Sequence, residues 1–117
     1  MIIGADYVLI GENLKPTKAY IKVSKGLITR VYESKPSNVD LYFDDCVIVP
    51  GFINMHTHVA DTIAKEKAYG LSVREAVAPP DGLKHRILRE TPRASIVKGI
   101  KIAIKEMLSY GITTFVD

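Results

Sequence analysis

The sequence contains no tryptophan, one cysteine and three histidines, and these small numbers exclude several kinds of protein. The single residue Cys46 cannot form an internal disulfide, which suits a reducing cytoplasm, where we expect the protein. No apolar run approaches the length of a membrane span, and we find no basic start followed by an apolar stretch. We therefore expect neither a signal peptide nor a membrane partner.

The excess of positive charge is also small. Sixteen lysines and arginines stand against thirteen aspartates and glutamates, which gives a formal net charge of +3. The basic residues are spread along predicted helices and are not interleaved with aromatic residues, so we expect no nucleic-acid partner. A hydrophobic content of 47% indicates a globular chain.

The first 48 or so residues predict strands only. Ser24-Lys25-Gly26 is typical of a hairpin turn, because glycine adopts the backbone angles that tight hairpins require. Short alternating or apolar runs flank the turn and recur after the loop that follows. The predicted strands cover residues 5–11, 19–23, 27–32, 41–43 and 47–49.

The remainder predicts helices between two strands. Ser72 and Glu75 form a capping box, which predicts a short helix to about Ala78. Asp81 and Thr91 are the predicted caps of two further helices, over residues 82–90 and 92–110. Residues 60–70 predict a loop. In the long helix, apolar residues recur at the spacing of one buried stripe. This stripe contains Ile96, Val97, Ile100, Ala103, Ile104, Met107 and Leu108. Gly111 then ends the helix before an apolar strand over residues 112–116.

The clearest chemical signal is the pair His56 and His58. Because side chains alternate along a strand, Asn54, His56 and His58 would share one face. Two imidazoles on one face can bind a single divalent ion, although a bare His-x-His is more often an ordinary structural pair. An apolar run at 47–49, the Pro50-Gly51 break and a second apolar strand favour the metal site here.

Two segments resemble the amidohydrolase superfamily. Residues 50–58, Pro-Gly-Phe-Ile-Asn-Met-His-Thr-His, resemble the first barrel strand of these metal-dependent hydrolases. Residues 106–117 resemble the "EML-x-x-G-x-T-T-x-x-D" stretch before and within the second barrel strand of the chlorohydrolase, guanine deaminase and cytosine deaminase branch.

The resemblance implies an α/β fold with an all-β preface. Residues 1–50 would be a partial β-sandwich, and residues 51–117 the first βαβ portion of a TIM-type (β/α)8 barrel. Such a barrel typically needs about 250 residues. We therefore expect an N-terminal fragment, with the barrel incomplete in this chain. Unpaired barrel edges favour association, so a homo-oligomer is expected.

The resemblance also implies a chemistry. His56 and His58 would be ligands of a divalent metal ion, most simply zinc, with iron or manganese as alternatives. Metal-activated water would hydrolyse a non-peptide C–N bond of a small heterocyclic or cyclic amide substrate, for example by deamination. The acid/base residues are not in this chain, so we expect the isolated chain to be inactive. Two alternatives stay open: a catalytically silent amidohydrolase-like scaffold, and one chain of a split enzyme.

Three further residues have more than one interpretation. Asp61 is a candidate for binding substrate or orienting a ligand, or it only caps the loop. His85 is a candidate at the mouth of the pocket, or it is a surface histidine. Asp117 ends the second strand, where capping is the simplest role.

Ala60 stands where dihydroorotase and hydantoinase relatives often carry a basic residue, which favours the deaminase or chlorohydrolase branch.

Overall fold

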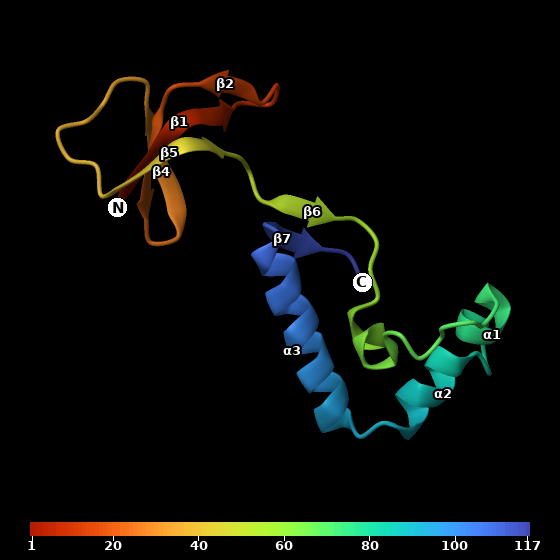
Figure 1. Cartoon of the computed structure of the whole chain (residues 1–117). Helices are drawn as coiled ribbons and strands as arrows, with labels where there is room; N and C mark the ends of the chain where they lie inside the picture. The colour runs from red at the N-terminus through yellow and green to blue at the C-terminus, as the bar shows by residue number, and fades with distance from the viewer. The chain divides into compact units, whose positions relative to one another are not determined.

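The computed structural model describes residues 1–117, which divide into two compact units, Met1–Pro50 and Gly51–Asp117 (Figure 1). The first unit contains strands only, and the second combines two strands with helices. The predicted mixed α/β class with a β-only beginning is therefore confirmed. The partial sandwich and the incomplete barrel stay predictions.

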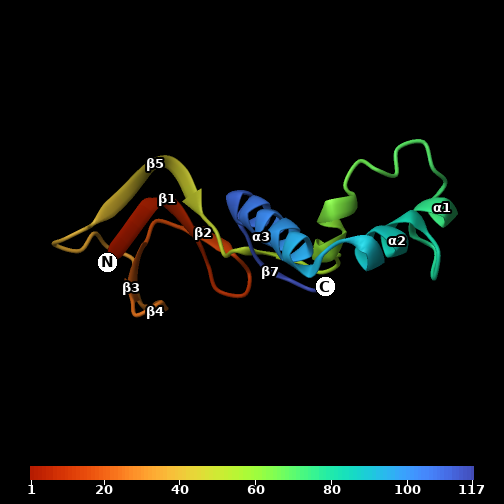
Figure 2. The same cartoon turned by 90° about the horizontal axis from the view of Figure 1, so that it is seen from below.

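The first unit is a five-stranded sheet built around its first strand. Strand β1 pairs antiparallel with β3 through its first residues and with β2 through its last residues. Strand β5 runs parallel to β1 over much of the same length, so it must occupy the opposite edge. Figure 2 shows β5 lying alongside β1. The strands are β1 (Ile2–Ile10), β2 (Lys15–Thr17), β3 (Tyr20–Ser24), β4 (Leu27–Tyr32) and β5 (Leu41–Ile48).

The predicted hairpin between β3 and β4 is confirmed. Ser24 pairs with Leu27, so Lys25 and Gly26 alone form the turn. Both turn residues have positive φ angles, 49° and 77°. This combination characterises the two-residue type I′ turn, which matches the twist of the flanking strands.

Two predictions in this unit were wrong. The first is an omission: strand β2 was not predicted, because Lys15-Pro16-Thr17 lacks an apolar pattern. These residues form a strand only through their pairing with β1. Strand β5 is continuous where two strands were predicted, and it contains an irregularity at Asp45, with a φ of 54°. The Asp6 carboxylate accepts the Asp45 N–H at 2.7 Å and the Tyr42 hydroxyl at 2.9 Å. Asp6 thus satisfies the irregular backbone that would otherwise interrupt the strand.

The core of this unit is small. Val8, Ala19 and Ile21 are buried, and four partly buried residues pack against them: Ile3, Ile10, Val23 and Ile48. Apolar residues of β4 stay exposed, including Leu27 at 68% and Ile28 at 66%. Apolar side chains of the sheet therefore remain uncovered in this unit.

The second unit is a βαβ arrangement with an insertion after its first strand. Strands β6 and β7 are parallel neighbours, and α3 precedes β7 directly. In both views α1 and α2 lie at the end of this unit remote from β6 and β7 (Figures 1 and 2). The elements are β6 (Phe52–Asn54), the 3-10 helix η1 (Val59–Ala64), α1 (Val73–Val77), α2 (Leu83–Glu90), α3 (Arg93–Ser109) and β7 (Ile112–Phe115). None of the helices combines the length and apolar content that crossing a bilayer requires.

The helix boundaries test the predicted caps. The capping box is confirmed: Glu75 N donates to Ser72 Oγ at 3.3 Å, and Ser72 N donates to Glu75 Oε2 at 2.8 Å. The Ser72 hydroxyl, at 2.6 Å, and then the Ser72 N–H donate to the Glu75 carboxylate and hold its pKa below the usual value of 4.5. Gly111, with a φ of 75°, ends α3 as predicted.

The other two predicted caps were wrong. The residue before α2 is Gly82 and the residue before α3 is Pro92, and neither makes a side-chain capping bond. The side chain of Asp81 instead lies 3.6 Å from Arg89 in the last turn of α2. The ion pair with this arginine replaces the predicted capping bond.

The predicted loop at 60–70 and the predicted helix stripe were partly wrong. Residues 59–64 form η1, which packs on α3 at Gly99, the one buried residue of that helix. A Cβ at Gly99 would lie 2.7 Å from Ile63 Cγ2, so only glycine permits this approach. Val97 and Leu108, predicted as buried, are 42% and 56% exposed. The stripe is half covered because η1 contacts only part of the helix.

Candidate metal centre

The two histidines follow the first strand of the second unit and do not lie on it. Strand β6 ends at Asn54, so the prediction that one strand face carries His56 and His58 was wrong. Asn54 Oδ1 accepts the His56 N–H at 3.2 Å, which forms an Asx turn. This turn competes with the strand ladder and ends it two residues before the first histidine.

Strand β7 nevertheless holds the segment that carries the histidines. Val116 N donates to the Asn54 carbonyl at 2.9 Å, and Thr57 N donates to the Val116 carbonyl at 3.0 Å. One residue beyond β7 therefore holds the chain on both sides of Met55 and His56. The histidines lie at the carboxyl ends of two parallel strands, which is where ligands bind in barrels and in open α/β sheets.

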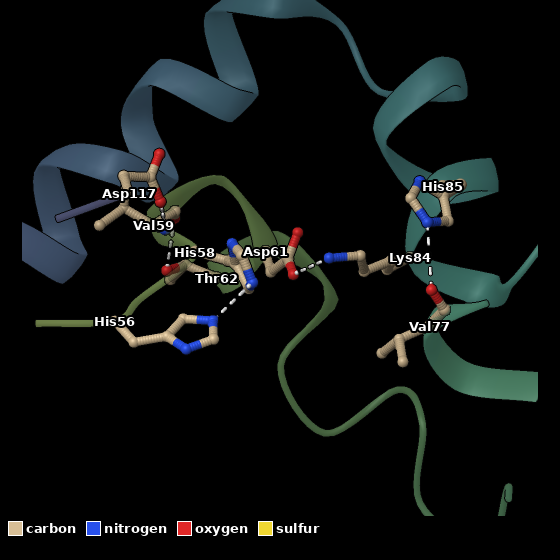
Figure 3. Close-up of polar contacts among 9 residues, drawn as sticks. All are labelled: His56, His58, Val59, Asp61, Thr62, Val77, Lys84, His85 and Asp117. Carbon is tan, nitrogen blue, oxygen red and sulfur yellow. Dashed lines mark hydrogen bonds and ion pairs between the residues drawn. The ribbon is translucent and has the colours of Figure 1, made fainter. Parts of the chain in front are cut away.

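The two imidazole rings lie close together in an edge-to-face arrangement. The Nε2 atoms of His56 and His58 lie 3.3 Å apart, with ring centroids 5.1 Å apart and ring planes at 87° (Figure 3). Zinc–imidazole bonds of about 2.0–2.1 Å in a tetrahedral site place two ligand nitrogens about 3.3–3.4 Å apart. The pair thus has the separation of two ligands of one tetrahedral zinc ion, and both side chains are exposed to an incoming ion.

The histidine pair has no further ligand in this chain. No group of three or more histidine, cysteine, aspartate or glutamate side chains converges to hold a metal ion. A tetrahedral ion at this pair would have two positions left for water, substrate or residues of other segments.

A cavity of about 420 Å³ lies beside the second histidine. His58, Asp61 and Thr57 line it from the segment after β6, and Met107 of α3 and Tyr110, the residue after α3, line it from the other side. Its wall is mostly apolar with a few polar groups, the composition of many small-molecule sites.

Asp61 is engaged by a lysine that the sequence analysis missed. The Lys84 ammonium lies 2.9 Å from Asp61 Oδ2, and the two side chains are only 19% and 27% exposed (Figure 3). Lys84 neighbours His85 in a basic stretch, and no spacing rule connects it to a residue 23 positions earlier. The substrate-binding role of Asp61 stays a prediction.

His85 lies apart from the histidine pair. Its Nε2 is 3.1 Å from the Val77 carbonyl of α1, and the side chain is half-buried between α1 and α2. In Figure 3 it lies apart from His56 and His58, beyond Asp61 and Lys84, and it does not line the cavity beside His58. Its substrate-binding role also stays a prediction, and its observed contact joins two helices.

Asp117 has the capping role that the sequence favours. Its Oδ1 accepts the N–H of Val59, the first residue of η1, at 2.8 Å. This N–H has no acceptor within the helix, because it belongs to the first turn.

Comparison with protein-family models covers the whole second unit and the last residues of the first. The model of the amidohydrolase family matches residues 47–117, which is more than half of the chain. The chain belongs to the amidohydrolase family. The matched part of this amidohydrolase includes β6, the histidine pair, η1, α3 and β7.

Curated relatives extend over the whole amidohydrolase chain. A putative aminohydrolase of Methanothermobacter thermautotrophicus is 26% identical over 118 residues, which cover 100% of this chain and 31% of the relative. An uncharacterized protein of Methanocaldococcus jannaschii is 34% identical over 93% of this chain and 28% of its own length. A 5-methylthioadenosine/S-adenosylhomocysteine deaminase of Thermococcus sibiricus is 30% identical over 100% of this chain and 27% of its own length. The chain spans under a third of the length of these relatives.

Proposed function

We propose that this chain is the N-terminal part of a metal-dependent amidohydrolase that hydrolyses non-peptide C–N bonds. The observation that carries the proposal is the 3.3 Å separation of His56 Nε2 and His58 Nε2, which fits two ligands of one divalent ion. The family of the chain and the deaminase names of several relatives support the same reaction class. We place the enzyme in the cytoplasm, because Cys46 is free.

His56 and His58 would hold the ion through Nε2. A bound divalent ion would lower the pKa of a water molecule toward neutrality, which would supply a nucleophile at neutral pH. The Asx turn at Asn54 and the backbone of Val116 orient the two imidazoles. The mostly apolar cavity beside His58 would receive the body of a small substrate next to the ion.

We propose an amino-substituted heterocycle as the substrate class, with a cyclic amide as the second choice. Relatives named as deaminases of adenosine derivatives support the first choice. Ala60 supports it as well, since no basic side chain stands two residues after His58 to bind a substrate carboxylate. We propose zinc as the metal, and elemental analysis distinguishes it from iron and manganese.

Ammonia release tests the activity. The complete polypeptide that carries this sequence is loaded with zinc and incubated with adenosine derivatives, aminopyrimidines and cyclic amides. We expect ammonia from at least one amino-heterocycle. The variants His56→Ala and His58→Ala should each lose activity by several orders of magnitude, because removing either residue leaves the ion one ligand short.

His85→Ala is the matched control, because it removes the third histidine of the chain at a place apart from the pair. This variant should retain the zinc content of the wild type, because His85 lies apart from the histidine pair. A zinc-loaded wild type that hydrolyses nothing in the panel would favour the catalytically silent scaffold. Activity that appears only after a second chain is added would establish a split enzyme.

A further inference from the structure

The residues on either side of His58 donate their N–H groups to two consecutive residues after β7. Thr57 N donates to the Val116 carbonyl at 3.0 Å, and Val59 N donates to Asp117 Oδ1 at 2.8 Å. Val59 is only 7% exposed, so its N–H would lack a partner without Asp117. His58 precedes η1 and offers no side-chain capping bond of its own.

A second contact holds the same segment from the side of α2. Asp61 N donates to the His58 carbonyl at 3.0 Å, and the Asp61 carboxylate pairs with Lys84. The Asp61–Lys84 pair is mostly buried, whereas the pair between Lys65, the residue after η1, and Glu106 of α3 has side chains 62% and 47% exposed. Exposed pairs are weakened by water and salt, so the Lys84 pair is the stronger restraint.

We infer that Asp117 and Lys84 are positioning residues for the metal ligand His58. Asp117 fixes the start of η1 and Lys84 fixes its first turn, so together they set the backbone from Val59 to Asp61. Neither side chain has a hydrogen bond to an imidazole; both act through the backbone. The inference rests on the proposed metal-binding function of the histidine pair.

The physical reason is that a metal site tolerates little displacement. Ligand distances in metal sites are held within about 0.2 Å, so the backbone that carries a ligand must already be in place. His56 is held by the Asx turn and by Val116. Restraint of His58 by Asp117 and Lys84 keeps its Nε2 at the 3.3 Å separation that zinc requires.

Substitutions in the complete polypeptide test this inference. Asp117→Ala removes the acceptor of Val59 N–H, and Lys84→Met removes the cation while keeping the aliphatic stem. Asp117→Asn retains an acceptor oxygen, and Lys84→Arg retains a cation. Lys65→Met removes the exposed ion pair after η1 and is the matched control. Zinc affinity is measured by competition with a chromophoric chelator, and amide hydrogen exchange of Val59 and Asp61 is measured by NMR in the metal-free protein.

We expect Asp117→Ala and Lys84→Met each to weaken zinc binding about 10-fold, as loss of outer-sphere partners commonly does. Exchange at Val59 should accelerate in Asp117→Ala, and exchange at Asp61 in Lys84→Met. Asp117→Asn and Lys84→Arg should restore most of the affinity, and Lys65→Met should match the wild type.

Two outcomes would overturn the inference while leaving the proposed function intact. In one, the wild type binds zinc and Asp117→Ala and Lys84→Met bind it equally well. In the other, all five variants lose affinity together with thermal stability, which would show a general structural effect. A wild type that binds no zinc would instead reject the proposed function. Hydrogen exchange at Val59 would then still test the positioning role of Asp117. If the Val59 amide is equally protected in Asp117→Ala and in the wild type, Asp117 does not restrain the backbone at this residue.

Discussion

The Nε2 atoms of His56 and His58 lie 3.3 Å apart, and their ring planes are nearly perpendicular, at 87°. The separation of the two nitrogens matches that of two imidazole ligands of one tetrahedral ion. Val116, the residue after β7, holds the segment that carries the histidines through its backbone.

Because His56 and His58 are its two ligands, we expect the isolated 117-residue chain to bind metal weakly but specifically. Two imidazoles fill half of a tetrahedral zinc site, so affinity should fall far below that of a complete site. His56→Ala, His58→Ala and the double variant should lose this binding to the same extent, because neither ligand is useful alone. Isothermal titration with zinc measures it, and additive losses from the two single variants would contradict the shared site.

We expect the first unit to lose stability at alkaline pH as Tyr42 becomes deprotonated. The hydrogen bond from its hydroxyl to Asp6, reinforced by desolvation and by the negative charge of Asp6, raises the pKa of Tyr42 from 10.0 to about 12. Because the folded-state pKa is raised, the stabilising contribution is complete below pH 10 and is lost as pH rises through about 12. Urea unfolding should therefore show the advantage of wild type over Tyr42→Phe shrinking across this interval.

Asp6→Asn is the control for this pH effect. It removes the carboxylate charge that raises the Tyr42 pKa, so the titration of Tyr42 should move back toward 10. Equal pH dependence of unfolding in wild type and Tyr42→Phe between pH 10 and pH 12 would show that the hydrogen bond is absent in solution.

We expect that residue 51, at the start of the second unit, must lack a Cβ atom. A Cβ at this position would collide with Oγ1 and Cγ2 of Thr113 on β7. Gly51→Ala should lower the free energy of unfolding by about 1–3 kcal/mol, the usual cost of overpacking. Thr113→Ala removes both atoms and should recover part of that loss, so a double-mutant cycle by urea unfolding should be non-additive. Strict additivity would mean that β6 and β7 do not approach this closely.

The small sheet of the second unit predicts self-association of the isolated chain. Strands β6 and β7 pair only with each other, and Phe52 and Ile53 are 57% and 59% exposed. Unpaired strand edges beside exposed apolar side chains promote association. Light scattering should give a mass above 12.9 kDa that falls in Ile53→Lys. Tyr69→Lys, at a 96% exposed residue outside the sheet, should leave the mass unchanged. A monodisperse monomer would contradict this prediction.

Local chemistry made several features predictable from the sequence. The turn at Lys25-Gly26, the box of Ser72 and Glu75, and the end of α3 at Gly111 each depend on residues within a few positions of one another. Backbone preference and short-range hydrogen bonds decide such features, and packing did not override them.

Tertiary contacts decided the features that the sequence could not predict. Strand β2 exists through pairing with β1, and η1 through contact with α3 at Gly99. At the candidate site, the adjacency of His56 and His58 was predicted, but from strand alternation, whereas an Asx turn positions them. The partners Lys84 and Asp117 act across 23 and 58 residues, where no local spacing applies.

The most direct test of a metal-dependent enzyme is the metal content of the complete polypeptide, measured by plasma emission spectrometry. The wild type, the double variant His56→Ala/His58→Ala and the control His85→Ala are purified in parallel after growth with zinc. We expect near-stoichiometric divalent metal in the wild type and in His85→Ala, and almost none in the double variant. A wild type without metal even after reloading, or a double variant with undiminished metal, would contradict the assignment of this pair as ligands.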